Sequence, residues 1–188
     1  VSVSYAAVEL AREIFGSLSK KRVLIIGAGK MSEGTARHLL RAGAAEILIT
    51  NRTAERADEL ARLFRGQIVA YETFPQHLAD VDIVVASSAA PGYVLTQDTV
   101  RRAIEARKNR PMFLIDIAVP RNIEPQVNGL EHAFVYDIDD LQRLAERNLQ
   151  ARREVAQQAE DIVTEEVARL EARLRERHVT PTILSLQE

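Results

Sequence analysis

Short runs of apolar residues alternate along the chain with segments in which apolar residues recur at helical spacing. The runs are almost uninterrupted, as expected for strands that are covered on both faces. They predict strands at residues 22–27, 46–50, 67–70, 83–86, 112–116 and 133–136. Helices are predicted between them, at residues 7–15, 31–41, 53–64 and 96–107. This alternation predicts an α/β fold in which a parallel sheet carries helices on both faces.

The first predicted strand runs directly into a glycine-rich loop that opens the next helix. Gly27 permits a tight turn, and Gly29 lets the backbone approach a pyrophosphate without an intervening Cβ. The third glycine position of such loops is Ser32 here. A lone loop of this kind also serves as a plain turn, but the flanking strand and helix favour a Rossmann-like, doubly wound sheet that binds a dinucleotide. The candidate pyrophosphate-binding residues are Gly27, Ala28, Gly29, Lys30, Met31 and Ser32.

The end of the second predicted strand indicates which dinucleotide binds. An NAD site has Asp or Glu about 20 residues after the loop, where it accepts a hydrogen bond from the ribose 2′-hydroxyl. This chain has Asn51, Arg52 and Thr53 there, and the first acidic residue is Glu55. Arg52 can bind a 2′-phosphate bidentately, although it could equally be a solvated charge, and Thr53 could be only a helix N-cap. The pattern favours NADPH over NADH.

Polar residues follow two later strands. Ser87, Ser88 and Ala89 can border the nicotinamide ribose, or they can form an ordinary polar loop stiffened by Pro91. Asp116 lies where a site residue would lie, but it could instead accept hydrogen bonds from loop N–H groups. No base, nucleophile or metal partner is near Asp116 in the sequence, so we predict no catalytic residue in this chain.

The last third of the chain differs from the rest. Residues 139–178 include no glycine or proline and carry apolar residues at helical spacing, which predicts one long helix that ends at Pro181. Its apolar stripe needs a partner, either a second copy of the chain or another domain. Acidic and basic residues alternate along it, which is typical of a solvated face and not of a nucleic-acid track.

Composition narrows the remaining chemistry. The 188 residues carry a formal net charge of -2, which predicts no strong general attraction to nucleic acid or an anionic membrane, so that such a partner would need a local patch. They contain no cysteine, which excludes disulfides and thiolate nucleophiles within them. The four histidines are scattered, so no metal site is predicted. No apolar run reaches the roughly 20 residues of a membrane span, and no signal peptide is evident. We therefore expect a cytoplasmic protein, and the first residue, Val1, suggests a part of a longer one.

Several segments together resemble glutamyl-tRNA reductase. They are the stretches at residues 2–11, 27–31, 51–53, 114–121 (LIDIAVPR), 136–141 (YDIDDL) and 180–183. The resemblance covers essentially the whole chain, and LIDIAVPR and YDIDDL are much more specific than the glycine loop. It implies an NADPH-dependent enzyme that reduces glutamyl-tRNA to glutamate-1-semialdehyde and so opens tetrapyrrole and haem synthesis. It also implies a V-shaped dimer in which a long spinal helix joins the domains.

The resemblance also implies how the chain is divided. Residues 1–18 would be a linker helix, residues 19–136 the NADP-binding domain, and residues 137–188 the spinal helix and the start of a dimerisation domain. The family's nucleophile is a cysteine in a preceding domain, so we expect this chain alone to bind NADPH without reducing glutamyl-tRNA. The implied partners are glutamyl-tRNA through the full-length protein, a second copy through the C-terminal helix, and glutamate-1-semialdehyde aminomutase. A plant source would imply a plastid location.

Two other interpretations remain open. A reductase that resembles shikimate dehydrogenase shares the Asn-Arg-Thr feature, but it does not account for the long helix or for LIDIAVPR. A non-catalytic module could instead sense a nucleotide and transmit a signal through its long helix. Hydride transfer by the protein with its remaining domains would distinguish an enzyme from such a module.

Overall fold

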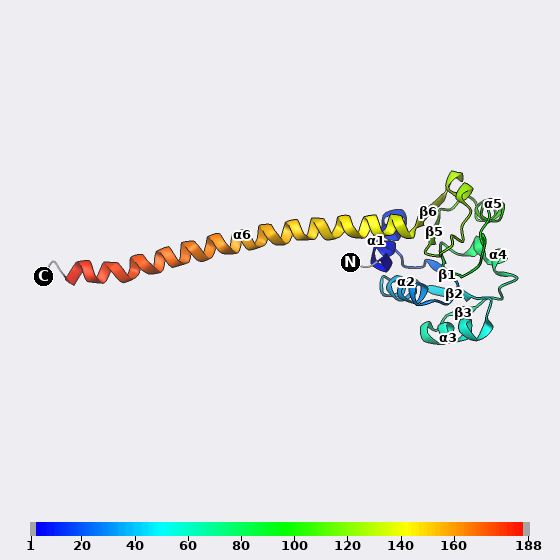
Figure 1. Ribbon diagram of the computed structural model, residues 1–188, viewed down its shortest axis with the longest axis horizontal. Helices are drawn as coiled ribbons and strands as arrows, with labels where there is room; N and C mark the ends of the chain where they lie inside the picture. Colours follow the sequence, from blue (N-terminus) through cyan, green and yellow to red (C-terminus); the bar gives the residue numbers. More distant parts are fainter. Residues whose placement is uncertain (1–2, 186–188) are drawn as a thin grey trace. The chain divides into compact units, whose positions relative to one another are not determined.

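Six parallel strands form one sheet at the centre of the fold (Figure 1). The computed structural model describes the backbone of residues 3–185 and the side chains of residues 3–174. The strand order is β3-β2-β1-β4-β5-β6. The strands are β1 (Arg22–Ile26), β2 (Glu46–Thr50), β3 (Gln67–Ile68), β4 (Ile83–Ala86), β5 (Met112–Asp116) and β6 (Ala133–Asp137). The predicted Rossmann-like parallel sheet is confirmed.

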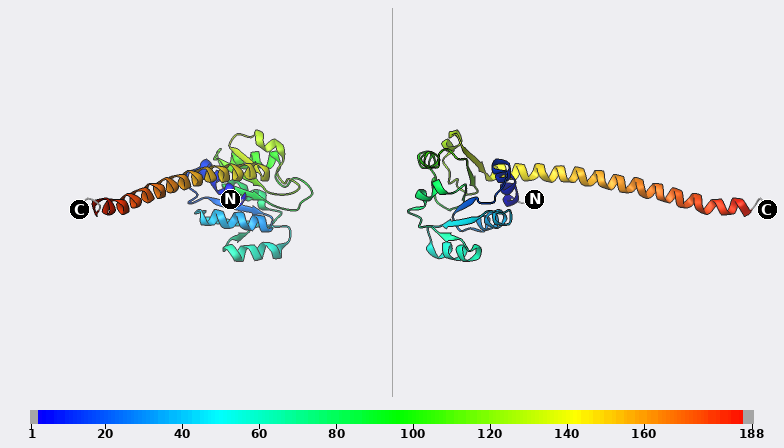
Figure 2. Two further views of the ribbon diagram at one scale, coloured as in Figure 1. Left: turned by 60° about the vertical axis from the view of Figure 1, so that its left-hand side comes forward. Right: turned by 180° about the vertical axis from the view of Figure 1, so that it is seen from behind.

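Two hydrophobic layers cover the two faces of the sheet. Successive strand residues point to opposite faces, so Ile25 of β1 belongs to one layer and Ile26 to the other. The first layer includes α1 (Val3–Phe15), α2 (Lys30–Arg41), α3 (Ala54–Phe64) and the start of α6 (Ile138–Ser185). The second includes α4 (Phe74–His77), η1 (Leu78–Asp80), α5 (Gln97–Ala106) and η2 (Pro125–Gly129). Helices pack on both sides of the sheet (Figure 2). Burial on both faces explains why the central strands are continuously apolar.

The order of the strands determines where a ligand can bind. From β1 the chain winds through α2 to β2 and then to β3, and from β3 it crosses to the other side of β1 to form β4. The connections that leave the carboxyl ends of β1 and β4 therefore run in opposite directions. Such a point in a doubly wound sheet leaves a crevice, and this is where dinucleotides bind.

The structure corrects two details of the prediction. The strand expected at residues 67–70 ends at Ile68, because it lies at the sheet edge and pairs only with two residues of β2. The long helix does not end at Pro181 but continues to Ser185. A proline within a helix removes one main-chain hydrogen bond, which bends or weakens a helix without necessarily ending it.

The start of α6 is fixed by a reciprocal set of hydrogen bonds. The Asp137 carboxylate accepts from the N–H groups of Asp139 and Asp140 at 2.9 Å, while Asp140 accepts from the N–H of Asp137 at 3.0 Å. Arg121, at the end of LIDIAVPR, forms ion pairs with Asp137 and Asp139. The two most specific segments of the sequence therefore meet here, and Leu141 packs into the core.

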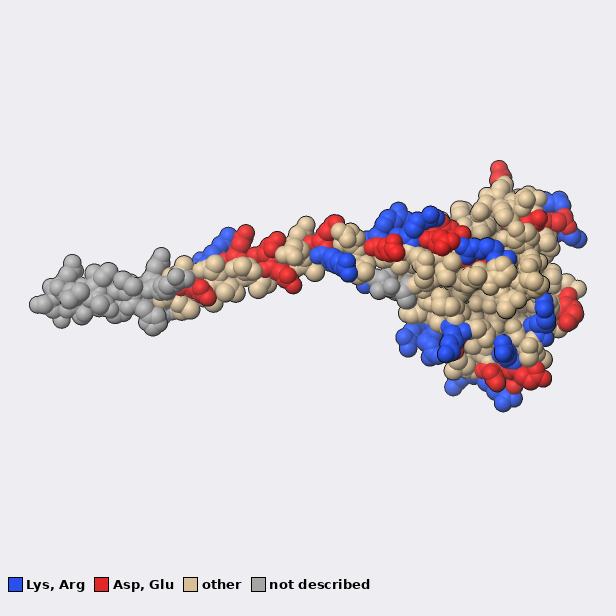
Figure 3. All heavy atoms as spheres, viewed as in Figure 1, with Lys and Arg blue, Asp and Glu red and all other residues tan. Residues whose placement is uncertain are grey.

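The chain divides into two compact units, one that ends at Ala145 and one that begins at Glu146. The described part of the second unit is the continuation of α6 beyond Ala145, and Figure 3 shows acidic and basic side chains interspersed along it. The domain boundaries expected from the resemblance, at residues 18 and 136, remain predictions.

Candidate functional site

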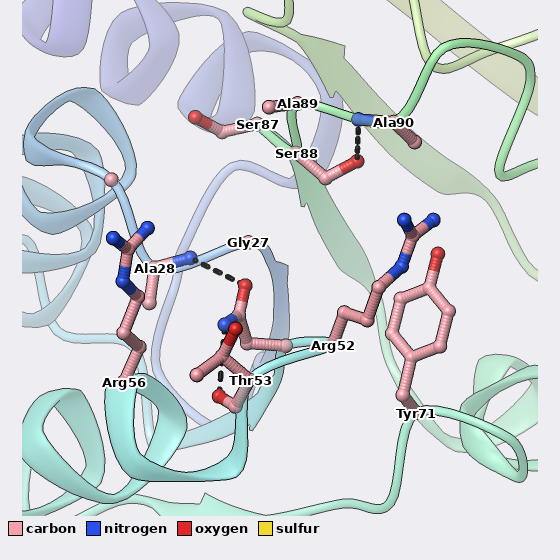
Figure 4. Close-up of a pocket in the computed structure, with 12 residues that line it drawn as sticks. Gly27, Ala28, Arg52, Thr53, Arg56, Tyr71, Ser87, Ser88, Ala89 and Ala90 are labelled. Atoms are coloured by element: carbon pink, nitrogen blue, oxygen red, sulfur yellow. Dashed lines mark hydrogen bonds between the residues drawn. The ribbon is translucent and has the colours of Figure 1, made fainter.

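A cleft of about 280 Å³ lies at the carboxyl ends of β2, β1 and β4. Three of the predicted segments contribute to it, although they are far apart in the sequence. The lining residues are Gly27, Ala28, Gly29, Asn51, Arg52, Thr53, Arg56, Tyr71, Ser87, Ser88, Ala89 and Ala90 (Figure 4). Nine of these were predicted from the sequence, while Arg56, Tyr71 and Ala90 were not. The cleft coincides with the point where the winding of the sheet reverses.

The backbone of Gly27 lies very close to the backbone of Ser87 and Ser88 in the loop after β4. Its φ is +100°, and a Cβ built at this position would lie 2.5 Å from the carbonyl oxygen of Ser87. No L-residue side chain fits there, because the loop after β4 crosses directly over the loop after β1. Gly27 is therefore required by the fold itself, in addition to the tight turn for which the sequence predicted it.

Gly29 has a different reason to be a glycine. Its φ is -95°, and the nearest atom to a Cβ at Gly29 would be the Ser87 hydroxyl at 3.8 Å, an ordinary contact. The fold alone would tolerate a side chain here. The missing Cβ instead leaves the floor of the cleft open at the N-terminus of α2, where unpaired N–H groups attract anions.

Ser32, at the third glycine position, stabilises this loop through hydrogen bonds to the main chain of Gly27 and Gly29. Its side chain is completely buried, and its hydroxyl lies 2.8 Å from the carbonyl oxygens of both Gly27 and Gly29. The same oxygen accepts a hydrogen bond from the Gly29 N–H at 3.0 Å. Ser32 therefore fixes the loop conformation and does not line the cleft, nor do the exposed side chains of Lys30 and Met31. Contact of these three residues with a cofactor remains a prediction.

Asn51 connects the two loops that form one side of the cleft. Its Oδ1 accepts from the Ala28 N–H at 3.4 Å, and its Nδ2 donates to the Thr53 carbonyl at 2.9 Å. Thr53 occupies the N-cap position of α3, but its hydroxyl makes no capping hydrogen bond. The Thr53 hydroxyl, which faces the cleft, is thus not needed to start the helix.

Two arginines flank Thr53 on the wall beyond β2 (Figure 4). The Arg52 guanidinium lies 5.7 Å from the centre of the Tyr71 ring, which supports it by a cation–π contact. Arg56 lies in the first turn of α3, and its place just after the predicted Asn-Arg-Thr segment could have identified it. The lining residues include no carboxylate. This wall is therefore suited to an anionic group such as a phosphate.

The two serines after β4 play different parts. The Ser88 hydroxyl and the Ser88 N–H both donate to Oδ1 of Asn122, each at 2.8 Å. The Ser87 hydroxyl makes no hydrogen bond to any described residue and lies close to Gly29, 3.8 Å from the position that a Cβ there would take. Ser87 consequently keeps its hydrogen-bonding capacity for a ligand, while Ser88 ties the loop to the protein interior.

Asp116 lies behind the cleft and organises the loop after β5. Its side chain is buried and accepts hydrogen bonds from the N–H groups of Ala118, Asn122 and Ile123, at 3.1, 2.9 and 2.9 Å. The structure therefore supports the loop-ordering role that the sequence left open. Burial raises the pKa of Asp116 above its ordinary value, although the three N–H groups and Arg121 act in the opposite direction. Cofactor contact by Asp116 remains a prediction.

We expect Asp116→Asn to destabilise the domain by about 2 kcal/mol at neutral pH, because an amide N–H₂ would face main-chain N–H donors. The folded state holds the Asp116 proton more tightly than the unfolded chain does, so wild-type stability falls as pH rises from 3.8 to the raised pKa. The difference in the free energy of unfolding between wild type and Asp116→Asn should therefore shrink as pH rises across that window and stay constant above it. Urea unfolding at a series of pH values measures this, and parallel pH profiles would contradict it.

Comparison with known proteins assigns the chain to a family. Residues 9–144 match the family described as shikimate / quinate 5-dehydrogenase. The chain belongs to this family. Within it, the chain is 59% identical over 188 residues to the glutamyl-tRNA reductase of Solibacter usitatus, covering 100% of this chain and 45% of that protein. The resemblance to glutamyl-tRNA reductase that the sequence predicted is confirmed.

Two solved structures extend this comparison. The glutamyl-tRNA reductase from Methanopyrus kandleri matches with a TM-score of 0.82 and 43% identity, over 93% of this chain and 44% of that one. The nucleotide-binding domain of the enzyme from Thermoplasma volcanium has a TM-score of 0.63 over 82% of this chain and 98% of that one. Its identity is only 14%, so it supports the fold alone.

The chain spans less than half the length of the curated relatives it matches. These relatives are glutamyl-tRNA reductases, so the shikimate-dehydrogenase-like alternative is supported only as a related fold. The dehydrogenase-type fold and the named relatives imply a nicotinamide cofactor. In the described part of the chain, no helix is long and apolar enough to cross a membrane. The described side chains, those of residues 3–174, include no group of three or more His, Asp or Glu that could hold a metal ion.

Proposed function

We propose that this chain is the NADPH-binding part of a glutamyl-tRNA reductase, which reduces glutamyl-tRNA to glutamate-1-semialdehyde on the way to haem and other tetrapyrroles. The observation that carries the choice of NADPH is the wall beyond β2. Arg52 and Arg56 both line it, and no carboxylate does. An NAD site would need a carboxylate there to accept the ribose 2′-hydroxyl, whereas two guanidiniums match a 2′-phosphate.

The residues present fit NADPH along the whole cleft. Arg52, Arg56 and the Thr53 hydroxyl would hold the adenosine 2′-phosphate, and Tyr71 supports Arg52. The open floor at Gly29 and the N-terminus of α2 would receive the pyrophosphate. Ser87 would then border the nicotinamide half. When bound, the dihydronicotinamide supplies a hydride for reduction of the activated glutamate.

In this reaction the described residues would position the cofactor and shield it from water, and no cysteine is among the residues that line the cleft. The thioester that the resemblance implies requires a cysteine, and these 188 residues contain none. We infer that a segment outside them supplies this cysteine opposite Ser87. Glutamyl-tRNA would accordingly bind to the full-length protein, and this chain alone would bind NADPH without turnover.

The second unit supports the proposal of a homodimer. Large apolar side chains are exposed along α6 at Leu149, Val155, Ile162, Val163, Val167, Leu170 and Leu174. A helix that exposes such a stripe to water gains stability by packing it against a second helix. A cytoplasmic location and an aminomutase partner remain predictions.

Arg52→Ala should weaken NADPH binding about tenfold and leave NADH binding within about twofold, since only NADPH carries the 2′-phosphate. Titration of the purified chain, followed by the fluorescence of the reduced nicotinamide, measures both. Arg41→Ala is a matched control, because Arg41 is exposed at the far end of α2 and its loss changes the net charge equally. Equal weakening of both nucleotides, or no binding to wild type, would overturn the choice of cofactor.

A further inference from the structure

We propose that Asn122 is a positioning residue that orients the loop formed by residues 87–90 toward the nicotinamide half of the cofactor. This inference rests on the proposed function, because it assumes that NADPH occupies the cleft. Asn122 is not among the residues that line the cleft, so it would act through Ser88 and not by touching the ligand.

Burial and main-chain hydrogen bonds fix the position of Asn122, so it can in turn fix the position of Ser88. Its side chain is completely buried, and its main-chain N–H donates to Asp116 at 2.9 Å. Its carbonyl oxygen accepts from the N–H groups of Val94 and Leu95, at 2.7 and 3.0 Å. Asn122 therefore joins the loops after β4 and β5, and Asp116 fixes it from behind.

The link from Asn122 to the cleft passes through one oxygen atom. Asn122 Oδ1 accepts from both the N–H and the hydroxyl of Ser88, which fixes the main chain and the side chain of that residue together. The Ser88 oxygen also accepts from the Ala90 N–H at 3.3 Å. Ser88 is thereby fixed to Asn122, while the neighbouring Ser87 hydroxyl lies 3.8 Å from the position that a Cβ of Gly29 would take.

The direction of the cofactor indicates which half should respond. The arginines fix the adenosine phosphate beyond β2, and the glycine loop lies beyond β1. The next strand in the sheet is β4, so the loop of residues 87–90 meets the nicotinamide half. Loss of the Asn122 contacts should therefore affect the nicotinamide half and spare the adenosine half.

The test compares two ligands in the same variant. Calorimetric titration of Asn122→Ala with NADPH and with 2′,5′-ADP, which lacks the nicotinamide half, separates positioning from general damage. We expect NADPH to bind about tenfold more weakly and 2′,5′-ADP to bind within about twofold of wild type. Asn128→Ala is the matched control, since Asn128 is exposed in η2 a few residues away. Equal weakening of both ligands, or no change in either, would overturn the proposal.

The alanine variant is expected to fold, because it also removes Nδ2 of Asn122, a buried group with no partner among the described residues. Ser88→Ala provides a second test that leaves the buried Asn122 in place. It should weaken NADPH binding by a smaller factor, and in the double variant the two effects should not add. Fully additive effects would mean that Ser88 acts independently of Asn122. Failure of wild type to bind NADPH would instead refute the proposed function.

Discussion

Gly27→Ala is expected to destabilise the domain by about 4 kcal/mol, one of the largest effects available from a single methyl group. The added Cβ would lie 2.5 Å from the carbonyl oxygen of Ser87 and 2.8 Å from the Ser88 nitrogen. Neither neighbour can move easily, because Ser87 N–H is bonded to Ile26 and Ser88 to Asn122. Thermal unfolding should show a melting temperature lower by about 10 °C for a chain of this size.

Gly43 offers a control that separates the strain of a side chain at positive φ from the clash of the added Cβ with the loop after β4. Its φ of +105° nearly equals that of Gly27, but the nearest atom to an added Cβ would be 4.0 Å away. Gly43→Ala should therefore cost only the conformational strain of about 1–2 kcal/mol. The difference between the two variants measures the clash with the loop after β4. Equal losses would mean that the two loops are not packed as described.

The central strands can be predicted from the sequence because burial on both faces requires a continuous apolar run, which is easy to recognise. Strands β1, β2, β4 and β5 are buried on both faces, so their apolar runs are continuous and their ends coincide with the first glycine or polar residue. The edge strand β3 is exposed and pairs on one side only, so its sequence specifies its length poorly. The prediction at residues 67–70 fails for this reason.

The residues of the candidate site also fall into those that the sequence predicts and those that it does not. Residues that directly follow a strand are predictable, because the topology brings the carboxyl ends of neighbouring strands together. Tyr71 follows the poorly specified edge strand, and Asn122 meets Ser88 across 34 positions of sequence. Such contacts depend on how separate loops fold over one another, which no local pattern encodes. Arg56 is intermediate, since it lies in the first turn of α3, directly after the predicted Asn-Arg-Thr segment.

The most specific sequence segments turn out to have structural roles. LIDIAVPR contains Asp116, which orders its own loop, and Arg121, which pairs with Asp137 and Asp139. YDIDDL supplies the reciprocal hydrogen bonds that start α6. A segment can therefore identify a family strongly because it builds the frame on which the cleft depends.

Gly29→Ala should have the opposite signature to Gly27→Ala, with binding lost and the fold retained. The only atom near the added Cβ would be the Ser87 hydroxyl at 3.8 Å, and the backbone of Gly29 suits any residue. Stability should change by less than about 1 kcal/mol, the usual difference between glycine and alanine at a helix N-cap. The methyl group would instead occupy the floor on which the pyrophosphate lies, so we expect NADPH to bind about a hundredfold more weakly.

Calorimetric titration with NADPH and a parallel thermal melt test both parts of this expectation. Gly129→Ala is the matched control, because an added Cβ there meets nothing within 4 Å and Gly129 is not among the cleft residues. 2′,5′-ADP keeps the 5′-phosphate that forms the adenosine side of the pyrophosphate, so it should also lose affinity in Gly29→Ala, which distinguishes this variant from Asn122→Ala. Unchanged NADPH affinity in a folded Gly29→Ala protein would mean that the glycine loop is a structural turn, and that the cofactor, if it binds, does not cross the N-terminus of α2.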